Sequence, residues 1–533
     1  MKNIILIGFM GTGKTVTGKR LAERLNWDFV DTDSEVERVT GKTIPQIFKQ
    51  FGEARFRSEE KLVVKKLSKK KHLVVATGGG AVLDRENVSR LKENGIIICL
   101  TADPETILKR IKAAQNRPLL SDKEDLKQKI GELLSARSQA YSVADFNIDT
   151  SLDQPDQVAE KIIQNLKERK KMPAPVDIYL DLDKRSYHIY IGQGLLNSVD
   201  CYLKELNLGK SVLLVSNPKV FGLYGDLVRE KLSAAGYRVI PALAQDSEEA
   251  KSLDVAGKLY DLAYDNGLDR QSVVVALGGG VVGDLAGFVA ATYMRGVAFV
   301  QLPTTLLAQV DSSVGGKVAV NHPRGKNIIG AFYQPRLVLT DINLISTLDD
   351  RELRTGLAEV IKSAIIADHE FFSWLVDHIC DLLDKQPEAL KKAISTSCII
   401  KTEVVQEDET ERGRRAVLNF GHTVGHAIEA LLGYNLYSHG EAVAIGMVAE
   451  SRLANELGIL TKEDTDRILS LIKKAGLPLE LPEQLSIDQL LSSILKDKKV
   501  INREYTFTLP VRIGRAEVIK GIPEGVMRRI FGR

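Results

Sequence analysis

The chain has 533 residues, of which 44% are hydrophobic and 27% are charged, and its formal net charge is +3. A length of this size predicts several domains of about 150 residues each. The small net charge argues against a dedicated nucleic-acid binder, which would carry a clustered basic excess.

The four cysteines, which are widely spaced, form no CxxC pair. A disulfide framework or a thiolate zinc site is therefore not expected, and a reducing compartment fits. The N-terminal run MKNIILIGFMGTGK ends in a glycine loop rather than a cleavage site, so it does not indicate a signal peptide. No apolar run reaches the ~20 residues that cross a bilayer. We expect a cytoplasmic protein that binds neither membrane nor nucleic acid.

Strand and helix patterns alternate in the N-terminal part of the chain. The apolar run at 4–7 predicts a buried strand that enters a glycine loop, and a helix pattern follows at 14–25. Further buried strands are predicted at 73–77 and 96–100. This alternation is typical of a parallel α/β sheet.

A linker follows this first domain. A charged amphipathic helix at 158–171 leads into MPAPVD (172–177), and two prolines within three residues indicate a break between domains.

The pattern restarts after the linker. A β-rich stretch at 177–193, a strand at 212–216 and a glycine loop at 278–283 predict a second α/β lobe. From about residue 343 long helical periods take over, such as 353–367 and 418–433, and they predict an all-α lobe. We therefore divide the chain into four segments: a domain at 1–168, a linker at 169–176, an α/β lobe at 177–342 and an all-α lobe at 343–533.

The glycine loop near the N-terminus carries a phosphate-binding motif. Residues 8–15 read GFMGTGKT, which fits G-x-x-x-x-G-K-[ST] between a predicted strand and a predicted helix. Glycines let backbone N–H groups point at phosphate oxygens, Lys14 adds a positive charge and the Thr15 hydroxyl can hold Mg²⁺. The motif predicts a P-loop nucleotide site.

Polar residues that suit an acceptor follow the P-loop. Asp31 and Asp33 come directly after a predicted strand, where a carboxylate can orient an acceptor hydroxyl or a magnesium ion. Arg55 and Arg57 lie near a predicted helix start and suit bidentate recognition of a carboxylate. For either arginine alone, a surface salt bridge is the simpler interpretation.

GFMGTGKT, DTD, FGEARFRSEE, TGGGAV and RPLL occur in the order seen in shikimate kinases, so residues 1–168 resemble that family. The resemblance implies ATP-dependent, Mg²⁺-assisted phosphorylation of shikimate on a P-loop NTPase-type parallel sheet, with Lys14 and Asp33 as catalytic residues. The implied nucleotide contacts are Gly11, Thr12, Gly13, Lys14, Thr15 (through Mg²⁺), Val16 and the lid residue Arg117. The implied shikimate contacts are Asp33, Arg57, Gly79 and Arg137.

A second glycine loop, ALGGGVVGD, lies between a predicted strand and a predicted helix at 276–284. This placement suits a pyrophosphate at a helix N-terminus, although the loop alone is equally typical of a tight turn. Downstream, 303–335 is rich in polar groups and shows little helix or strand period, so we expect a long irregular, functional segment. Its polar residues suit an anionic, hydroxyl-rich substrate; they are Asp311, Lys317, Lys326 and Asn327.

Candidate metal ligands lie in the predicted helical lobe. Glu359 is three residues before Lys362, His422 and His426 are four residues apart, and His439 precedes a helix. Two imidazoles and one carboxylate make a catalytic zinc site with an open position. The spacing leaves open which two histidines bind metal, and a lone histidine on an apolar helix is more often a packed core residue.

The block at 303–335 together with NFGHTVGHAIE and HGEAVAIGM resembles 3-dehydroquinate synthases, over about 177–533. The resemblance implies an NAD⁺-binding α/β lobe, a metal-binding helical lobe, and conversion of 3-deoxy-D-arabino-heptulosonate 7-phosphate to 3-dehydroquinate and phosphate. The implied ligands of Zn²⁺ or Co²⁺ are Glu359, His422 and His439.

The same resemblance implies the remaining site residues and a homodimer formed through this module. NAD⁺ contacts would be Asp246, Glu248, Lys251, Gly280, Val281, Val282, Gly283, Asp284, Thr304, Thr305, Lys317, Lys326, Leu344, Ile345, Ser346 and Thr347. Substrate contacts would be Arg295, Asp311, Asn327, Lys362, Lys401, Arg415 and Lys498. Catalytic roles would fall to Lys317, Lys362, Arg415, Asn419 and His426, the last beside the substrate phosphate or as support.

One residue departs from the family pattern. Ser247 stands where the family usually has glycine, between Asp246 and Glu248. If this position requires a positive φ, serine costs roughly 1 kcal/mol there. We expect a small local shift rather than loss of NAD⁺ binding.

Two other functions compete with a bifunctional shikimate-pathway enzyme. The second module suits a metal-dependent alcohol dehydrogenase, fused to a kinase for another small metabolite. Alternatively, one module is a binding or assembly unit without activity. The dense lysine set and the retained Lys14, Asp33, Glu359 and His439 favour the two enzymes.

Overall fold

The computed structural model describes residues 2–113, 126–141, 143–171, 174–411, 413–433, 436–496 and 505–531. The chain divides into two compact units, Met1–Met172 and Pro173–Arg533. Among the described residues, no helix is long and apolar enough to span a bilayer.

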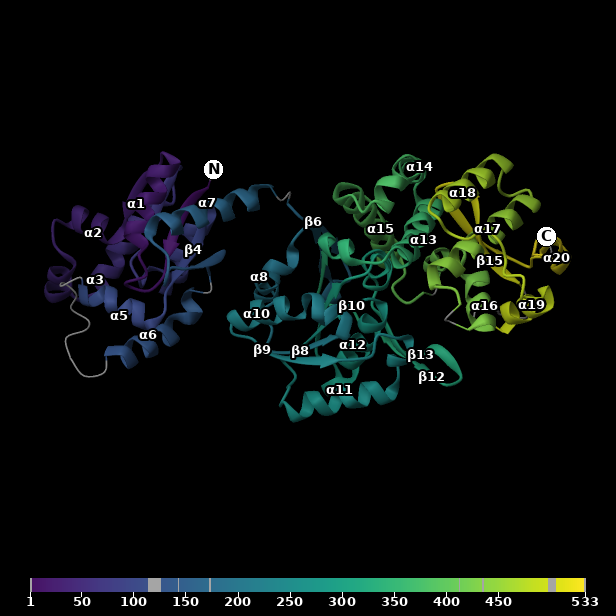
Figure 1. Cartoon of the computed structure of the whole chain (residues 1–533), viewed down its shortest axis with the longest axis horizontal. Coiled ribbons are helices and arrows are strands. Elements are labelled where there is room, and N and C mark those ends of the chain that lie inside the picture. Colours follow the sequence, from purple (N-terminus) through teal and green to yellow (C-terminus); the bar gives the residue numbers. More distant parts are fainter. Residues whose placement is uncertain are drawn as a thin grey trace. The chain divides into compact units, whose positions relative to one another are not determined.

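The first unit is a five-stranded parallel sheet with the strand order β2-β3-β1-β4-β5 (Figure 1). Alternate residues of β1 enter two different cores: Ile4 and Leu6 pack on one face, and Ile5 and Ile7 on the other. Helices cover both faces, which explains the continuous apolar run of this strand. The strands are β1 (Asn3–Ile7), β2 (Asp28–Asp31), β3 (Leu73–Ala76), β4 (Gly95–Thr101) and β5 (Phe146–Asp149). The helices are α1 (Lys14–Leu25), α2 (Thr32–Thr40), α3 (Ile44–Leu67), α4 (Arg85–Asn94), α5 (Pro104–Ala113), α6 (Leu126–Tyr141) and α7 (Pro155–Lys171).

The second unit contains a seven-stranded sheet with the order β6-β7-β14-β11-β10-β8-β9. Only β6 runs antiparallel to its neighbour; the other pairs are parallel. The strands are β6 (Val176–Leu180), β7 (Tyr187–Gly192), β8 (Ser211–Ser216), β9 (Arg238–Leu243), β10 (Val273–Gly278), β11 (Ala298–Pro303) and β14 (Leu337–Asp341). The helices are α8 (Val199–Glu205), α9 (Pro218–Val220), α10 (Asp226–Ala234), α11 (Leu253–Asp265) and α12 (Gly280–Thr292). Strand β10 delivers the second glycine loop directly to the start of α12.

The segment 303–335, expected to be irregular, is largely ordered, and that expectation is wrong. It contains a short π-helical turn, η7 (Ala308–Ser312), and an antiparallel hairpin of β12 (Lys317–His322) and β13 (Gly325–Phe332). The hairpin projects from the α/β lobe (Figure 1). Strand β12 buries only Val318 and Val320, and β13 contains two glycines and is largely exposed, so the alternation was too weak to recognise in the sequence.

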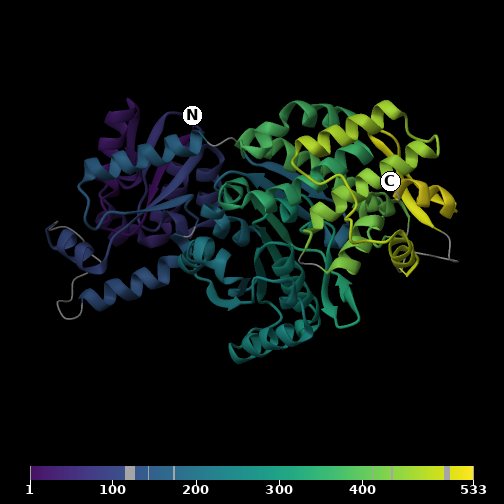
Figure 2. The same cartoon turned by 45° about the vertical axis from the view of Figure 1, so that its right-hand side comes forward.

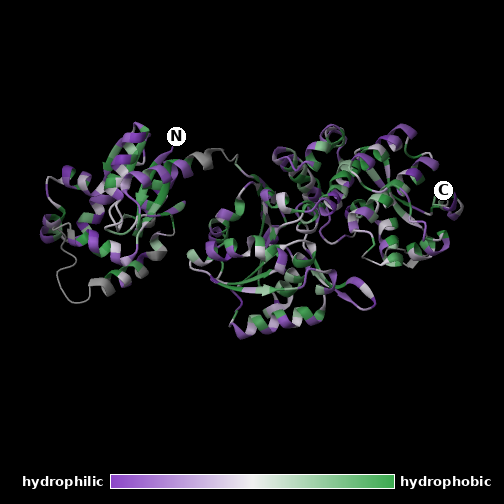
Figure 3. Ribbon diagram, in the orientation of Figure 1, coloured by the Kyte–Doolittle hydropathy of each residue, from purple (hydrophilic) through white to green (hydrophobic). Residues whose placement is uncertain are grey.

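The rest of the second unit is a helical lobe around the largest core of the molecule (Figure 2). Hydrophobic residues concentrate on the inward faces of its helices, and polar residues face outward (Figure 3). Its helices are α13 (Asp350–Ala367), α14 (His369–Leu383), α15 (Pro387–Glu407), α16 (His422–Leu432), α17 (His439–Glu456), α18 (Lys462–Lys474), α19 (Ile487–Lys496) and α20 (Glu524–Phe531). The sequence did not predict the hairpin of β15 (Thr506–Arg512) and β16 (Arg515–Lys520). The predicted fold class of two α/β sheets and a helical lobe is otherwise confirmed.

Glycines allow α16 and α17 to approach closely. A Cβ atom on Gly446 of α17 would overlap the carbonyl oxygen of Gly421, and one on Gly425 of α16 would lie 3.1 Å from the backbone of Ala442. This contact brings the two histidine-bearing helices together.

Gly446→Ala is therefore expected to destabilise the second unit by about 1–3 kcal/mol, the usual cost of overpacking. Gly257→Ala is the matched control, because a Cβ atom there meets nothing within 4 Å and helix α11 gains up to about 1 kcal/mol. Urea unfolding followed by Trp374 fluorescence in a Trp27→Phe background measures both. Equal stability of the two variants would contradict the close helix contact.

Candidate functional sites

The P-loop follows the carboxyl end of β1, and its backbone carbonyls accept hydrogen bonds from Lys14. Gly11 and Gly13 have φ of 81° and 87°, a conformation that suits glycine. Lys14 Nζ donates to the carbonyl oxygens of Gly8 (2.8 Å) and Phe9 (2.9 Å). The first turn of α1 thus faces the loop with its N–H groups, which is the arrangement that binds phosphate.

Asp31 links the P-loop to the next element. It accepts a hydrogen bond from Thr15 Oγ1 (2.7 Å) and caps α2 by accepting from the backbone N–H of Asp33 (3.0 Å). The carboxylate therefore lies beside the hydroxyl predicted to hold Mg²⁺, where it can take part in the hydration shell of the ion.

The loop Gly78–Gly80 is surrounded by the predicted acceptor residues. A Cβ atom on Gly78 would meet Asp33, one on Gly80 would lie 2.6 Å from Arg57 Nη2, and one on Gly79 would lie 3.7 Å from Arg137 Nη1. Only glycines leave the backbone open to a small polar ring at this place. The structure thus brings together Asp33, Arg57, Gly79 and Arg137.

Three further residues of this site were missed by the sequence analysis. Glu60 is buried and pairs with Arg57 (2.9 Å), and burial raises the pKa of Glu60 although Arg57 opposes the rise. Tyr141 Oη donates to Gly79 O (2.8 Å), and Arg110 Nη1 donates to Gly11 O (3.3 Å). Glu60 stands three residues after Arg57, so helical spacing could have found it; the other two come from distant elements. Arg117 lies outside the described residues.

In the second unit, a buried lysine joins several predicted NAD⁺ residues. Lys251 Nζ donates to Asp284 Oδ2 (2.7 Å) and Asn327 Oδ1 (2.6 Å) and lies 3.5 Å from Glu248 Oε1. Burial opposes the charge of Lys251, but Asp284 and Glu248 outweigh it and raise the pKa of the lysine.

The other predicted NAD⁺ residues follow the carboxyl ends of the strands. Gly280–Asp284 form the first turns of α12, Thr304 and Thr305 follow β11, and Leu344–Thr347 lie in η8 (Ile342–Thr347) after β14. The carboxyl ends of parallel strands are where open α/β sheets bind their ligands. Ser247 has φ of −155°, an extended backbone that any residue adopts, so the strain considered for serine does not arise.

The predicted cationic substrate residues are held by carboxylates and carbonyls between the two lobes. Lys401 Nζ donates to Asp311 Oδ1 (2.6 Å) and O (2.7 Å). The buried Arg415 donates to Gly315 O (3.1 Å). Lys317 Nζ pairs with Glu411 Oε2 (2.6 Å), and Asn419 donates to the other oxygen of Glu411 (3.2 Å). The sequence analysis did not identify Glu411.

Arg295 does not join this group within one chain. It precedes β11, whereas Thr304 follows the same strand, so the two residues lie at opposite edges of the sheet. Six strand residues separate those edges by roughly 20 Å. Lys498 lies outside the described residues.

Glu359 of α13 lies at the centre of a cluster with two imidazoles. Its Oε1 is 3.5 Å from His422 Nε2 and 3.7 Å from His439 Nε2, and it has no hydrogen-bond partner among the described residues. Its Oε2 forms an ion pair with Lys362, which is equally buried. Burial opposes the charge on both, yet each pKa moves toward the ionised form: that of Glu359 is well below and that of Lys362 above its ordinary value.

The hydrogen bonds of the histidines favour this ligand set. His422 Nδ1 contacts Phe420 O (3.1 Å) and His439 Nδ1 contacts Glu429 Oε2 (3.4 Å), so the Nε2 atom of each ring faces Glu359. Acceptors on Nδ1 leave the Nε2 lone pair for a metal. A second group, His426, Glu429 and His439, is also close enough to bind an ion. It would use His439 through the nitrogen that Glu429 already engages.

The electrostatics of the cluster suit a bound cation. Burial alone would lower the pKa of His439, but Glu359 and Glu429 raise it to about 10. Burial and Lys362 lower the pKa of His422 well below its ordinary value, so that ring stays neutral. The cluster thus offers the neutral imidazole of His422, the carboxylate of Glu359 and the imidazole of His439, which lies between two carboxylates. Two imidazoles and one carboxylate are a donor set for Zn²⁺ or Co²⁺.

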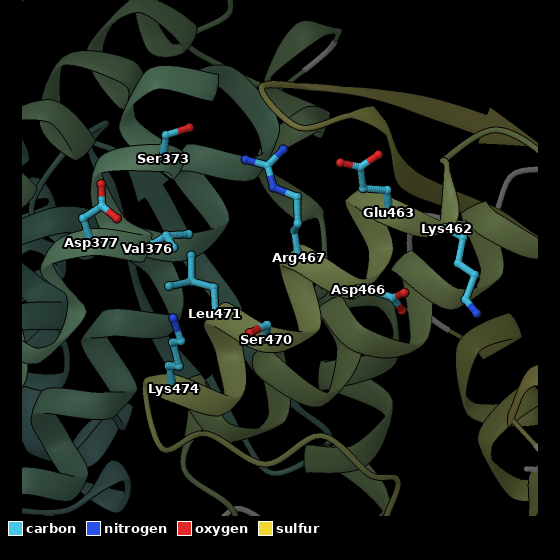
Figure 4. Close-up of a pocket in the computed structure, with 10 residues that line it drawn as sticks. All are labelled: Ser373, Val376, Asp377, Lys462, Glu463, Asp466, Arg467, Ser470, Leu471 and Lys474. Carbon is cyan, nitrogen blue, oxygen red and sulfur yellow. The ribbon is translucent and has the colours of Figure 1, made fainter.

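A separate open groove of about 800 Å³ lies between α14 and α18 (Figure 4). Its lining mixes both charges and contains none of the predicted site residues. The residues are Ser373, Val376, Asp377, Lys462, Glu463, Asp466, Arg467, Ser470, Leu471 and Lys474. Nothing in this lining converges as the metal cluster does, so we do not assign chemistry to it.

Comparison with known families assigns both units. Residues 10–167 match the shikimate kinase family, 242–355 the 3-dehydroquinate synthase N-terminal family and 356–500 the 3-dehydroquinate synthase C-terminal family. The 3-dehydroquinate synthase of Pelotomaculum thermopropionicum is 57% identical over 350 residues, which are 66% of this chain and 94% of the relative. That of Nostoc punctiforme is 47% identical over 356 residues, which are 66% of this chain and 98% of the relative.

Solved structures resemble the second unit. A 2-deoxy-scyllo-inosose synthase complexed with carbaglucose-6-phosphate, NAD⁺ and Co²⁺ is 26% identical, covers 67% of this chain and 99% of its own, and has a TM-score of 0.62. The 2-epi-5-epi-valiolone synthase of Streptomyces hygroscopicus with NAD⁺ and Zn²⁺ bound is 29% identical, with coverage of 66% and 97% and a TM-score of 0.61.

Glu359→Gln is expected to weaken Co²⁺ or Zn²⁺ binding strongly, because it removes the charged ligand. The loss should exceed the roughly 10–100-fold that follows when a residue hydrogen-bonded to a metal ligand is removed. Competition of the purified chain with a chromophoric chelator measures the affinity. His426→Ala is the comparison that decides the ligand set. A larger loss for His426→Ala than for Glu359→Gln would assign the metal to the second group.

Proposed function

The chain belongs to the 3-dehydroquinate synthase family and carries a shikimate kinase domain, and on this premise we propose which residues perform its two reactions. One reaction is the ATP-dependent phosphorylation of shikimate. The other converts 3-deoxy-D-arabino-heptulosonate 7-phosphate to 3-dehydroquinate and phosphate. The family match over nearly the whole length of these relatives leaves the alcohol dehydrogenase alternative without support.

In the kinase, the chain's residues position two anions against each other. Lys14 and the first turn of α1 would hold the ATP phosphates. Thr15, which donates to Asp31, would hold Mg²⁺ together with that carboxylate, and the ion would neutralise charge on the transferring group. Asp33 orients the shikimate hydroxyl and takes its proton as the oxygen bonds to phosphorus and the bond to ADP breaks. Arg57, next to Gly80, and Arg137, next to Gly79, hold the shikimate carboxylate.

In the synthase, Glu359, His422 and His439 would hold the divalent metal. Glu359 Oε1 carries this assignment: it is buried, it is faced by two Nε2 atoms, and it has no hydrogen-bond partner in the part of the chain that the structure describes. The metal would make a substrate hydroxyl more acidic, and NAD⁺ would serve as a reversible hydride acceptor. Two solved relatives are complexes with NAD⁺ and Co²⁺ or Zn²⁺, which supports the same cofactors here.

The remaining groups bind and orient the substrate. Lys362, kept cationic by Glu359, adds a positive charge beside the metal. Lys401, Arg415 and Asn419 supply cationic and amide donors for the phosphate and the carboxylate.

His426 completes the set of donors beside the cluster. Its ring lies 5.3 Å from that of His422 and 6.1 Å from that of His439, and this proximity supports a role as donor to an anionic group there.

NAD⁺ would lie along the carboxyl ends of β10, β11 and β14. Gly280–Asp284 offer the N-terminal turns of α12 to the pyrophosphate. Lys251 pairs with Asp284 of α12, and Lys326 of the hairpin pairs with Glu248, so both would add positive charge beside the cofactor. Lys317 of the hairpin, which pairs with Glu411, would complete this set.

We propose a homodimer through the synthase module, and the position of Arg295 supports it. This predicted substrate residue lies at the sheet edge opposite its own site, so as a substrate contact it would have to serve the site of a second copy. We also retain the domain limits at 168, 176 and 342. A cytoplasmic location accords with the four cysteines, all of which are free.

Lys14→Met is expected to lower kcat of shikimate phosphorylation by about 100–1,000-fold, because one preorganised positive group is lost from the transition state. ADP formation measures the kinase, and phosphate release from the heptulosonate phosphate measures the synthase in the same preparation. Glu359→Gln is the reciprocal variant and should silence only the synthase. If either substitution lowered both activities, the assignment of one reaction to each unit would fail.

A further inference from the structure

Glu429 is a buried carboxylate to which the proposed reactions give no role. Its side chain is 6% exposed, and it lies on α16 seven residues after His422 and three after His426. Residues at these spacings share one face of a helix. Glu429 therefore faces the metal cluster, although its nearest partner comes from another helix.

That partner is His439, the first residue of α17. Glu429 Oε2 lies 3.4 Å from His439 Nδ1, and His439 Nε2 faces Glu359 Oε1. An ionised carboxylate can only accept a hydrogen bond, so Nδ1 donates its proton to Glu429 and Nε2 is the nitrogen that a metal would bind, in place of a proton. His422 has the same arrangement, with Phe420 O in the place of Glu429. Each proposed histidine ligand thus has an acceptor behind it.

The two acceptors differ in how they are held beside the histidine. Phe420 O is a backbone atom, held by the fold itself two residues before His422. Glu429 is a side chain, and a single substitution removes it without altering the backbone.

The other oxygen of Glu429 reaches the α/β lobe. Lys326 Nζ, on β13, lies 4.0 Å from Glu429 Oε1 and 3.6 Å from Glu248 Oε1. A chain of charges therefore runs from Glu248 through Lys326 and Glu429 to His439. Lys326 is thus a second positive group that pairs with Glu429, through the oxygen that His439 leaves open.

The same atoms argue against Glu429 as a metal ligand. A metal bound to Glu429 would displace it from His439 Nδ1 and would compete with Lys326 for the carboxylate. It would also leave Glu359 Oε1 buried without a partner, which is costly.

We propose that Glu429 is a positioning residue that fixes the orientation of the His439 ring, so that Nε2 points at the metal site, and ties this ring to the β12–β13 hairpin through Lys326. This inference rests on the proposed metal site of Glu359, His422 and His439. Glu429 acts through His439 and touches neither metal nor substrate.

Co²⁺ affinity of the full chain, measured by chelator competition without nucleotides, tests the proposal directly. Glu429→Leu removes acceptor and charge and should weaken Co²⁺ binding about 100-fold. Glu429→Gln keeps an acceptor and loses only the charge, so it should weaken binding roughly 10-fold; these are the two ends of the range for outer partners of metal ligands. Glu456→Gln is the matched control, since Glu456 is on the same helix as His439 but pairs with Arg529 (3.3 Å). It should bind Co²⁺ as the unsubstituted chain does.

The outcomes separate the proposal from the function on which it rests. If the unsubstituted chain bound no Co²⁺ beyond the Glu359→Gln background, the metal site itself would be wrong and the inference with it. If the unsubstituted chain bound Co²⁺ and Glu429→Gln did so within twofold, only the role of Glu429 would be overturned. The comparison of Glu429→Gln with the unsubstituted chain tests the role of Glu429 even if Glu429→Leu does not fold. A loss in Glu429→Gln as large as in Glu359→Gln would make Glu429 a ligand instead.

The visible absorption of bound Co²⁺ gives a second readout. An altered orientation of His439 changes the ligand field of the ion, whereas general destabilisation only lowers the amount bound. Glu429→Leu loaded to saturation should show a shifted spectrum, and Glu429→Gln a spectrum close to that of the unsubstituted chain. Identical spectra for all three would overturn the positioning role.

Discussion

The buried charge of Glu359 is the constraint on which the synthase half of the molecule depends. A carboxylate removed from water costs several kcal/mol unless cations or hydrogen bonds surround it. Here the compensation comes from Lys362 one helical turn away and from two histidines on other helices. Three helices must therefore converge on one carboxylate, and the glycines between α16 and α17 let two of them approach closely enough. This arrangement supports the metal site proposed above.

The two glycine triplets, Gly78–Gly80 and Gly278–Gly280, both follow a strand but leave room for different groups. Both follow a buried parallel strand, and both open onto the carboxyl edge of a sheet. Gly78–Gly80 leave room for Asp33, Arg57 and Arg137 around a small ring, whereas Gly279 and Gly280 lead into a helix whose N–H groups suit a pyrophosphate. The triplets therefore reflect one backbone solution used in two unrelated domains. They are not traces of an internal duplication.

Several features of the fold and of the sites could be predicted from short sequence motifs, because the residues that form them are close together in the sequence. The P-loop, the histidines of α16 and the proline linker all fall within short stretches. The β12–β13 hairpin was missed because β13 contains two glycines and is largely exposed, so no alternation of buried residues marks it. Glu411 and Glu429 were missed for another reason: their partners Lys317 and His439 come from other elements, and only the fold brings them together. The place of Arg295 at the far sheet edge likewise follows from strand direction, which no motif states.

The measurement that tests the central claim most directly is phosphate release from 3-deoxy-D-arabino-heptulosonate 7-phosphate, with NAD⁺ well below the substrate concentration and absorbance at 340 nm followed alongside. The account predicts one phosphate for each substrate, no net NADH, and a rate that EDTA abolishes and Zn²⁺ or Co²⁺ restores. Net NADH without phosphate, or phosphate release that is indifferent to EDTA, would contradict it.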